Sequence, residues 1–485
     1  MLFVLAILVA SSAAQARAYH KSRSLAHRGR AQPRSPASSV RQVFAHVVQG
    51  NFQAYTAFSW AADVALAASS GIDGFVLNVG HDPSDSAQLA LAYSAAEAYT
   101  EAHPYHPFYM CVSLDMVYTS RFGSADAILQ QYVVPFAGRP GQYKRNGQVF
   151  LTTFSGENAA TWLEGNADIN SAWAGLKLLA LSKYSVSIFF APMWTGLSAS
   201  TAVSSHPVVD GIGQWLGWPI TNSQPSTLVD RTFQDDAVRN NKLYLAPISP
   251  FFSVHMTSEN NYIYRSDDWL IVNRYLQLIR LETVPSLVEL ISWNDYGEGH
   301  YIGPLRSEAN LPTETMSAGA YTSDMPHNVS LSSSLLHGYD WSSPLLAPYP
   351  QALLTLILFL NTYYKTLAFP TVSNTSIWLW HRPHPRDAVA TADLLSRPLN
   401  AAWTSDNVYA VVLVRQGSEA TWARFESGSR TSPGFSVKSG QINLLSFAFE
   451  PGKQVIVSSF CFSSAKFATL MADRARGCRD GSRHC

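Results

Sequence analysis

The stretch from Ile291 to Tyr301 carries the densest set of groups that could do chemistry. It places Asp295 and Glu298 three residues apart, among tryptophan, tyrosine, asparagine and histidine side chains. Apolar surroundings raise the pKa of a carboxyl group, whereas hydrogen bonds to its anion lower that pKa. Two carboxyl groups in unequal surroundings can divide the work of giving and accepting a proton. We therefore predict that Asp295 and Glu298 are catalytic and act by acid/base chemistry.

A purely structural explanation fits the same two acids about as well on spacing alone. Asp295 could cap a helix, and Glu298 would then be an ordinary acid of its first turn. Four further candidates also have ordinary explanations. His46 could be a buried histidine, Asp115 could be a turn residue at a strand end, and Trp215 and Trp218 could be core residues.

Eight short apolar runs indicate the strands that must position these residues. Most runs are continuous rather than alternating, as expected for strands covered on both faces. They span residues 43–48, 74–79, 108–115, 148–154, 187–193, 208–215, 243–249 and 287–295. Helical patterns lie between them, and we expect helices over 60–69 (capped by Ser59 and ended by Gly71), 84–101, 267–282 and 346–367.

This alternation predicts an α/β fold, a (β/α)8 TIM barrel over residues 41–368. A doubly wound open sheet is the alternative, but no GxGxxG follows the first strand. After Pro370 the runs become short and rich in β-branched or aromatic residues, at 376–383, 408–415, 420–425, 442–449 and 454–462. They predict a small all-β sandwich domain over 369–462, followed by an irregular tail over 463–485.

The active site of a TIM barrel lies at the carboxyl ends of its strands, so the residues that follow each run are the candidates for substrate binding. Amides, carboxylates and flat aromatic rings gather there, which is the set that a sugar-processing site needs. We predict substrate contacts from His46, Asn51, Asn78, Asp82, Asp115, Trp215, Trp218, Phe252, Trp293, Asn294, Tyr296, His300 and Tyr301. We expect no metal, because His46, His81 and His300 are scattered and no HExxH spacing occurs.

The composition limits the partners of this chain. Charged residues make up only 14%, and 34 basic residues balance 34 acidic ones, so nothing recruits nucleic acid. Residues 1–16 form an apolar run with a small-x-small end, which predicts a signal peptide rather than a membrane anchor. Residues 17–40 are basic and predict a disordered pro-region. We therefore expect a secreted monomer without stable membrane association, glycosylated at Asn328 and Asn374, with Cys111 as a buried free thiol.

Several stretches together resemble the fungal endo-α-1,3-glucanases, or mutanases, of glycoside hydrolase family 71. The resemblance covers roughly residues 41–460 and is strongest from Trp293 to Leu305. The other matching stretches are 43–46 (Val-Phe-Ala-His), 50–51, 68–80, 113–116 (Ser-Leu-Asp-Met), 247–252 (Pro-Ile-Ser-Pro-Phe-Phe) and 380–385. The family motif often has serine where this chain has Gly299.

The resemblance implies a TIM barrel followed by a β-sandwich, acting outside the cell or at the cell wall on the polysaccharide α-1,3-glucan without a cofactor. It also implies an inverting mechanism in which Glu298 is the general acid and Asp295 is the base. Two alternatives stay open: a hydrolase of another glucan linkage, and a non-catalytic protein that binds wall polysaccharide. The presence of both Asp295 and Glu298 argues against the second alternative.

Overall fold

A computed structural model of the chain describes residues 40–80, 82–157, 168–310, 352–382, 385–387, 393, 395–418, 421–448, 450, 454–459 and 468–472. The predicted signal peptide, nearly all of the predicted pro-region and the sequon at Asn328 lie outside these residues. In the described part of the chain, no helix is both long and apolar enough to cross a membrane.

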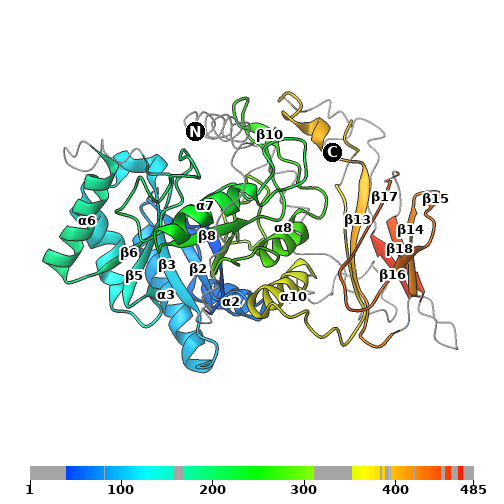
Figure 1. Cartoon of the computed structure of the whole chain (residues 1–485), viewed down its shortest axis with the longest axis horizontal. Coiled ribbons are helices and arrows are strands. Elements are labelled where there is room, and N and C mark those ends of the chain that lie inside the picture. Colours follow the sequence, from blue (N-terminus) through cyan, green and yellow to red (C-terminus); the bar gives the residue numbers. More distant parts are fainter. Residues whose placement is uncertain are drawn as a thin grey trace, which may run out of the picture.

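A curled parallel sheet forms the first part of the molecule (Figure 1). β1 pairs with β2 on one side and with β11 on the other, and β11 continues the sheet to β8 and β7. On the opposite side the sheet runs from β2 through β3 and β5 to β6, and Met193 forms bridges to both Phe154 and Gly213. The parallel strands are β1 (Gln42–Val48), β2 (Gly74–Val79), β3 (Tyr109–Asp115), β5 (Gln148–Phe154), β6 (Ile188–Phe190), β7 (Gly211–Gly213), β8 (Leu243–Ile248) and β11 (Leu287–Leu290), with β4 (Lys144–Arg145) antiparallel to β5.

All eight predicted strands are confirmed in position, but three of them are shorter than predicted by several residues. β6 and β7 each have three residues, and β11 ends at Leu290 instead of reaching Asp295. The chain turns back on itself after β11, because Ser292 N donates to His300 O at 2.7 Å and Ile302 N donates to Ser292 O at 3.0 Å. Asp295 therefore lies in a loop rather than in the sheet.

Helices connect the strands, and the four predicted ones are present with somewhat different ends. The cap prediction for the first was wrong, because α2 begins at Ala57 and the Thr56 side chain accepts a hydrogen bond from Ser59 N. The helices and helical turns are η1 (Gln49–Phe52), α2 (Ala57–Ser69), α3 (Asp85–Ala102), η2 (Met116–Arg121), α4 (Ala125–Ile128), η3 (Leu129–Val133), α5 (Val134–Ala137), α6 (Ile169–Tyr184), α7 (Leu228–Arg239), α8 (Leu270–Ile279) and α10 (Ala352–Thr366).

Successive residues of the parallel strands pack on opposite faces of the curled sheet. On β1, Val43, Ala45 and Val47 belong to the larger hydrophobic cluster, which also contains the helix residues. Phe44 belongs instead to a second cluster inside the curl, with Val76, Cys111, Phe150 and Leu245 among its members. This alternation follows from the period of two residues in a strand, and it points His46 and Asn78 to the inner face.

Two antiparallel sheets form the C-terminal part of the molecule. One contains β12 (Ser376–Trp380), β13 (Asn407–Leu413) and β17 (Asn443–Ala448); the other contains β14 (Thr421–Ser427), β15 (Arg430–Thr431), β16 (Phe435–Val437), β18 (Gln454–Ser459) and β19 (Ala468–Ala472). The turn η6 (Ala401–Trp403) precedes β13. A hydrophobic cluster joins the sheets through residues such as Val412 and Phe425. β19 lies in the segment that we expected to be irregular, where pairing with β18 supplies order that local sequence does not.

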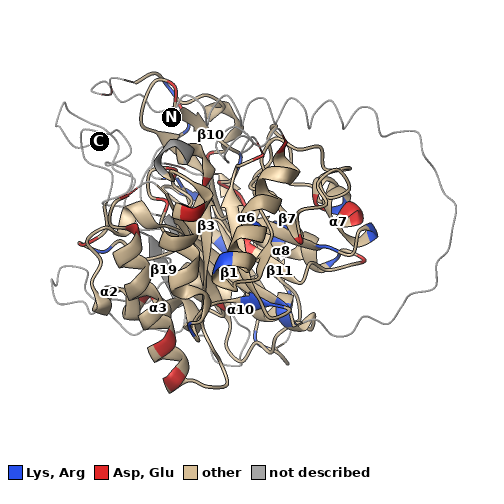
Figure 2. Cartoon of the chain, turned by 90° about the vertical axis from the view of Figure 1, so that its left-hand side faces the viewer, with Lys and Arg blue, Asp and Glu red and all other residues tan. Residues whose placement is uncertain are grey.

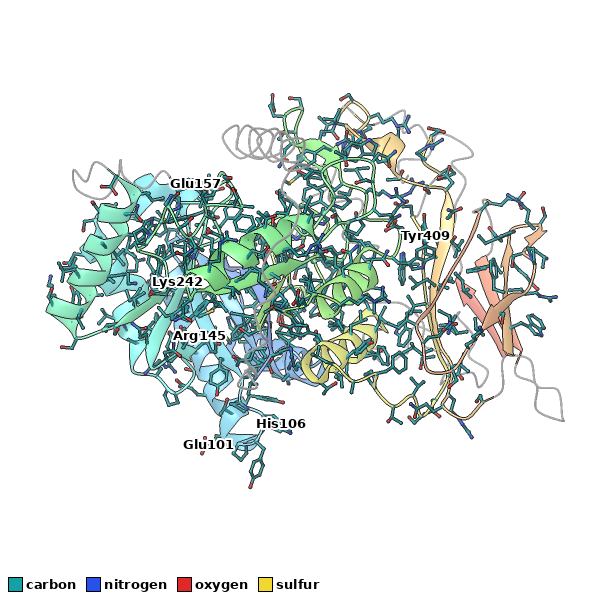
Figure 3. All side chains as sticks on the ribbon, viewed as in Figure 1. Glu101, His106, Arg145, Glu157, Lys242 and Tyr409 are labelled. Carbon is teal, nitrogen blue, oxygen red and sulfur yellow. The ribbon has the colours of Figure 1, made fainter. Side chains whose placement is uncertain are left out.

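Aromatic residues join this part to the curled sheet. Trp269 Nε1 donates to Ala410 O at 3.1 Å, and Trp378 Nε1 donates to Thr355 Oγ1 at 3.0 Å. Tyr409, on the side of β13 that faces the first part in Figure 3, packs edge-on against Trp269. Basic and acidic residues are interspersed over the elements in Figure 2.

Candidate active site

The carboxyl ends of the parallel strands form the rim on which the predicted site residues gather. Figure 3 gives the direction of the strands, since Arg145, before β5, lies below Glu157, which follows it. Asp115 ends β3 and is partly buried at this rim. It accepts hydrogen bonds from Val117 N at 3.1 Å and from the Asn78 side chain. Asp115 is thus both a strand-end turn residue and an inward-facing acid.

Asp295, Glu298 and His300 form the centre of the rim. His300 Nε2 donates to Glu298 Oε2 at 3.0 Å and lies 3.5 Å from Asp295 Oδ2. The two carboxylate side chains are 22% and 21% exposed, whereas the His300 side chain is fully buried. Asp295 Oδ1 also accepts from Glu298 N at 3.3 Å. The predicted helix cap is therefore a turn cap, and the two acids lie together at the surface of the rim.

Electrostatics separate these groups from ordinary surface acids. Burial, with a smaller contribution from the neighbouring Glu298 carboxylate, raises the pKa of Asp295 to about 6, although His300 acts in the opposite direction. Burial disfavours a charge on His300, but the Asp295 and Glu298 carboxylates outweigh burial and raise the pKa of that imidazole. Burial also raises the pKa of Asp115 to about 6, against the hydrogen bond from Val117. The rim therefore holds carboxyl groups that titrate near neutral pH.

Aromatic rings cover His300 and line one side of the centre. Trp218 packs on His300 with ring centroids 5.2 Å apart, and Phe252 stacks on it at 5.6 Å. Trp215 packs edge-on against His46 at 4.8 Å. These rings are nearly buried, with Trp215 7% exposed and Trp218 5% exposed. Both tryptophans are packed, as expected for core residues. However, they pack against His46 and His300, which are histidines of the site.

Four residues of the predicted set belong to the framework beneath the site. They are at most 1% exposed: Trp293, Asn294, Tyr296 and Tyr301. Asn294 exchanges two hydrogen bonds with the backbone of Val48, at 2.7 and 2.9 Å, and its own carbonyl accepts from Asn51 Nδ2 at 2.9 Å. Trp293 Nε1 donates to the buried carboxylate of Asp63 at 2.9 Å. These contacts tie the loop after β11 to the end of β1, so the groups position the acids rather than face a substrate.

Asp82 lies away from the centre, in the turn that starts α3. Its Oδ1 accepts from Ser84 N at 2.7 Å, and its Oδ2 accepts from the Gln53 side chain. Asp82 is partly buried, and these bonds give it a local structural role at the rim.

Gly299 has a conformation that explains its departure from the family motif. Its φ of +65° lies in the left-handed region, and a Cβ there would come 2.9 Å from Ser253 O. Because any side chain would be both strained and crowded, glycine is the residue that fits this backbone. The same approach lets Ser253 N donate to Glu298 O at 3.0 Å.

A hairpin that the sequence analysis missed flanks Glu298. It consists of β9 (Ser253–His255) and β10 (Asn261–Ile263), and it is held by backbone bonds between Ile263, Asn261 and Leu399. Burial and the Glu298 charge raise the pKa of Tyr262, and they raise the pKa of Tyr264 to about 12. The alternating Tyr262 and Tyr264 were the available signal, but their distance from the strand-end motif along the chain concealed it.

Asp295, Glu298 and His300 are also the group of described residues that could hold a metal ion, although we expected none. One ligand atom from each lies within 4.8 Å of the other two. The expectation rested on the spacing of histidines along the chain, and that spacing does not show that one imidazole joins two acids in space. Hydrogen bonding through His300 Nε2 accounts for the grouping without an ion.

A pair of carboxyl groups at the strand ends, of which Asp295 has a raised pKa, lies beside aromatic rings and defines the class: this is a glycoside hydrolase. Residues 39–343 match the sequence model of glycosyl hydrolase family 71, and the chain belongs to that family.

Three relatives are similar over most of their length. "Glucan endo-1,3-alpha-glucosidase agn1" of Schizosaccharomyces pombe is 32% identical, covering 79% of this chain and 80% of that protein. "Ascus wall endo-1,3-alpha-glucanase" of the same yeast is 30% identical, covering 76% and 78%. "Mutanase Pc12g07500" of Penicillium rubens is 28% identical, covering 84% and 79%.

Proposed function

We propose that the chain hydrolyses α-1,3-glucosidic bonds of α-1,3-glucan, with Asp295 and Glu298 as its catalytic acids. The observation that carries the proposal is the pairing of these two carboxylates through His300 at the strand-end rim. The names of the three relatives support this substrate over another glucan linkage. Both acids are exposed enough to reach a sugar, which favours an enzyme over a non-catalytic wall-binding protein.

In the proposed mechanism Asp295 is the base and Glu298 is the acid. A pKa of about 6 makes Asp295 a stronger proton acceptor than an ordinary aspartate, while leaving it ionised at neutral pH. It takes a proton from the attacking water, and Glu298 gives its proton to the departing glycosidic oxygen. His300 holds both carboxylates in register before the sugar binds.

We propose that hydrolysis inverts the anomeric configuration. The distance between the two carboxyl groups shows which movement this mechanism needs. Oxygen atoms of Asp295 and Glu298 approach within 4.8 Å, whereas inverting enzymes keep their carboxyl groups about 6.5–9.5 Å apart and retaining enzymes about 5–5.5 Å apart. Inversion therefore requires Glu298 to leave His300 when the substrate enters. Retention needs no such movement and is the second candidate. Proton NMR of the first product formed decides: a β-anomer establishes inversion, and an α-anomer establishes retention.

Reducing-sugar release from insoluble α-1,3-glucan tests the activity itself. We expect release by the wild type and a loss of about 100- to 10,000-fold in Glu298→Gln, which removes the acid proton and nearly preserves the shape. Release from β-1,3-glucan but not from α-1,3-glucan would move the assignment to another linkage. Binding without release by a folded wild type would establish the wall-binding alternative.

We also propose the finer architecture and the location. The curled sheet with its helices is a (β/α)8 barrel over residues 41–368, and the two antiparallel sheets are a β-sandwich that begins at 369. The bridges of Met193 and the cluster shared by both sheets support these assignments. We propose secretion as a monomer, and Asn374 is exposed, as glycosylation requires. Mass spectrometry of the secreted protein before and after glycosidase treatment tests secretion and glycosylation together.

A further inference from the structure

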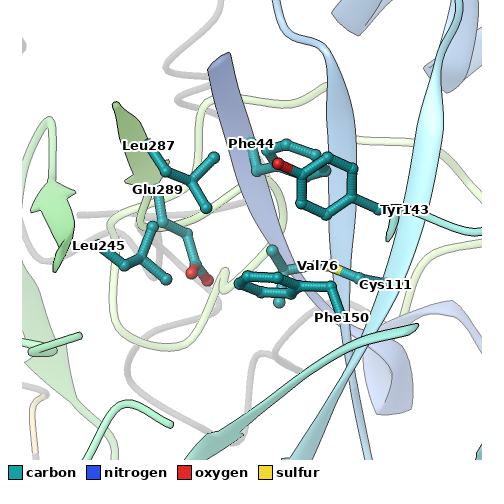
Figure 4. Close-up of a pocket in the computed structure, with 8 residues that line it drawn as sticks. All are labelled: Phe44, Val76, Cys111, Tyr143, Phe150, Leu245, Leu287 and Glu289. Atoms are coloured by element: carbon teal, nitrogen blue, oxygen red, sulfur yellow. The ribbon is translucent and has the colours of Figure 1, made fainter. Parts of the chain in front are cut away.

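An acid, Glu289, lies inside the curled sheet, in the middle of β11. It is fully buried, and it is in register with Phe44 on β1 and Pro247 on β8. Figure 4 shows its carboxylate among apolar side chains, with Leu245 and Phe150 nearby. A carboxyl group in such surroundings is costly unless it is paired, so the identity of its partner decides what Glu289 does.

The partner is His46. Its Nδ1 lies 2.7 Å from Glu289 Oε1, and the two side chains are 2% and 0% exposed. Glu289 Oε2 has no hydrogen-bond partner among the described residues. The hydrogen bonding of this carboxyl group is therefore directed at one ring nitrogen.

The net charge of the buried pair determines whether the other ring nitrogen of His46, Nε2, carries a proton. A net charge at a dry site costs more than a neutral pair. The pair is neutral either as an imidazolium with a carboxylate or as an imidazole with a carboxylic acid. A proton on Oε2 would be a buried donor with no acceptor among the described residues, so in both states one proton lies between Nδ1 and Oε1 and the second proton is on Nε2. Both neutral states thus give His46 an Nε2–H donor.

This donor faces the rim. Nε2 is on the far side of the ring from Nδ1, and His46 follows Phe44 along the inner face of β1 toward the strand ends. His46 interacts electrostatically with two acids there, and in its charged form it lowers the pKa of Asp115 and of Asp295. The edge of Trp215 fixes the plane of the ring.

We propose that Glu289 is a positioning residue that keeps His46 in the Nε2–H form, and that this N–H donates to a hydroxyl group of the sugar bound between Asp115 and Asp295. The assignment of the sugar rests on the proposed function. The proton on Nε2 does not, and it can be measured without substrate.

NMR of protein labelled with ¹⁵N-histidine tests the proton directly, with the His46 signals assigned by their loss in His46→Gln. We expect a protonated Nε2 in the wild type, and a mixture of tautomers in Glu289→Gln, because an amide can either donate to Nδ1 or accept from it. A bare Nε2 in the wild type would overturn the proposal even if the protein degrades α-1,3-glucan.

A double-mutant cycle tests the role in turnover. We expect Glu289→Gln and His46→Gln each to lower kcat/KM about 10- to 100-fold, as for carboxylates that orient other functional histidines, and the double variant to be no worse than His46→Gln alone. Fully additive losses would overturn the coupling. Cys111→Ala is the matched control, since Cys111 borders the same apolar cavity but its thiol faces Phe75 O; it should lower stability and leave kcat/KM unchanged. If the wild type leaves α-1,3-glucan intact, the proposed function fails while the NMR result still decides the tautomer.

Discussion

Two aspartates of this molecule, Asp230 fully buried and Asp295 partly exposed, show how the environment divides structure from chemistry. Asp230, on α7, receives two hydrogen bonds from Arg274 at 2.9 and 3.0 Å and a third from Tyr244 at 2.9 Å. Asp295, at the rim, forms an ion pair with His300 at 3.5 Å instead. A guanidinium satisfies a carboxylate permanently, whereas a shared imidazole leaves Asp295 able to exchange a proton.

Substitution of each acid should separate catalysis from stability, and the largest effect is expected at the rim. Asp295→Asn should lower kcat about 100- to 10,000-fold, because the amide cannot accept a proton. Its melting temperature at pH 7 should not fall, because the raised pKa of Asp295 means that the folded state disfavours its charge above pH 6. Glucan assays and calorimetry measure both quantities. A variant that keeps its activity would remove Asp295 from the mechanism.

The opposite result is expected at the permanent pair. Arg274→Met leaves the Asp230 carboxylate buried without its cation, which should lower the free energy of unfolding by about 3–5 kcal/mol. The kcat of the folded fraction should not change, because this pair lies outside the rim. Urea unfolding and active-enzyme titration measure the two effects. A loss of kcat at unchanged stability would contradict the division between these aspartates.

The pH dependence of kcat/KM sharpens the comparison at Asp295 itself. A base must be ionised, so kcat/KM should fall about tenfold per pH unit below a pKa of about 6. An ordinary aspartate would place this limb near pH 3.8. Asp115→Asn should move the limb to lower pH, because the charge of Asp295 raises the pKa of Asp115 and repulsion between two like charges is mutual. A limb that stays below pH 4 in the wild type would exclude Asp295 as the essential base.

The smallest effects are expected from alanine substitutions at two glycines of positive φ, one at the rim and one elsewhere in the chain. Gly299 and Gly147 both have positive φ, at 65° and 78°, but a Cβ at Gly147 would meet nothing within 4 Å. Gly147→Ala should cost about 1–2 kcal/mol of stability and leave kcat unchanged. Gly299→Ala should also lower kcat, because its Cβ would push Ser253 away from Glu298. Equal activity of the two variants would mean that the loop tolerates that displacement.

The candidate site could be predicted from sequence only where its residues are neighbours along the chain. Asp295, Glu298 and His300 lie within six residues, and their convergence was visible in the motif. The motif did not show which of its residues are site residues and which are framework residues, because Asn294 and Trp293 carry the same kinds of groups. Burial alone separates them, since Asn294 bonds to Val48, which lies 246 residues away in the chain.

The sequence by itself determined the parallel strands and the sequence family, and it predicted the pair of acids, since hydrophobic runs and local spacing are properties of short segments. The tertiary structure decided which acid is satisfied and which is available, because that depends on groups brought together from distant segments. Glu289 illustrates the difference: it is one acid in an apolar run, and its partner His46 lies 243 residues away in the chain. Only closure of the sheet between β1 and β11 brings the two together, and with that contact the sheet fixes which nitrogen of His46 faces the rim.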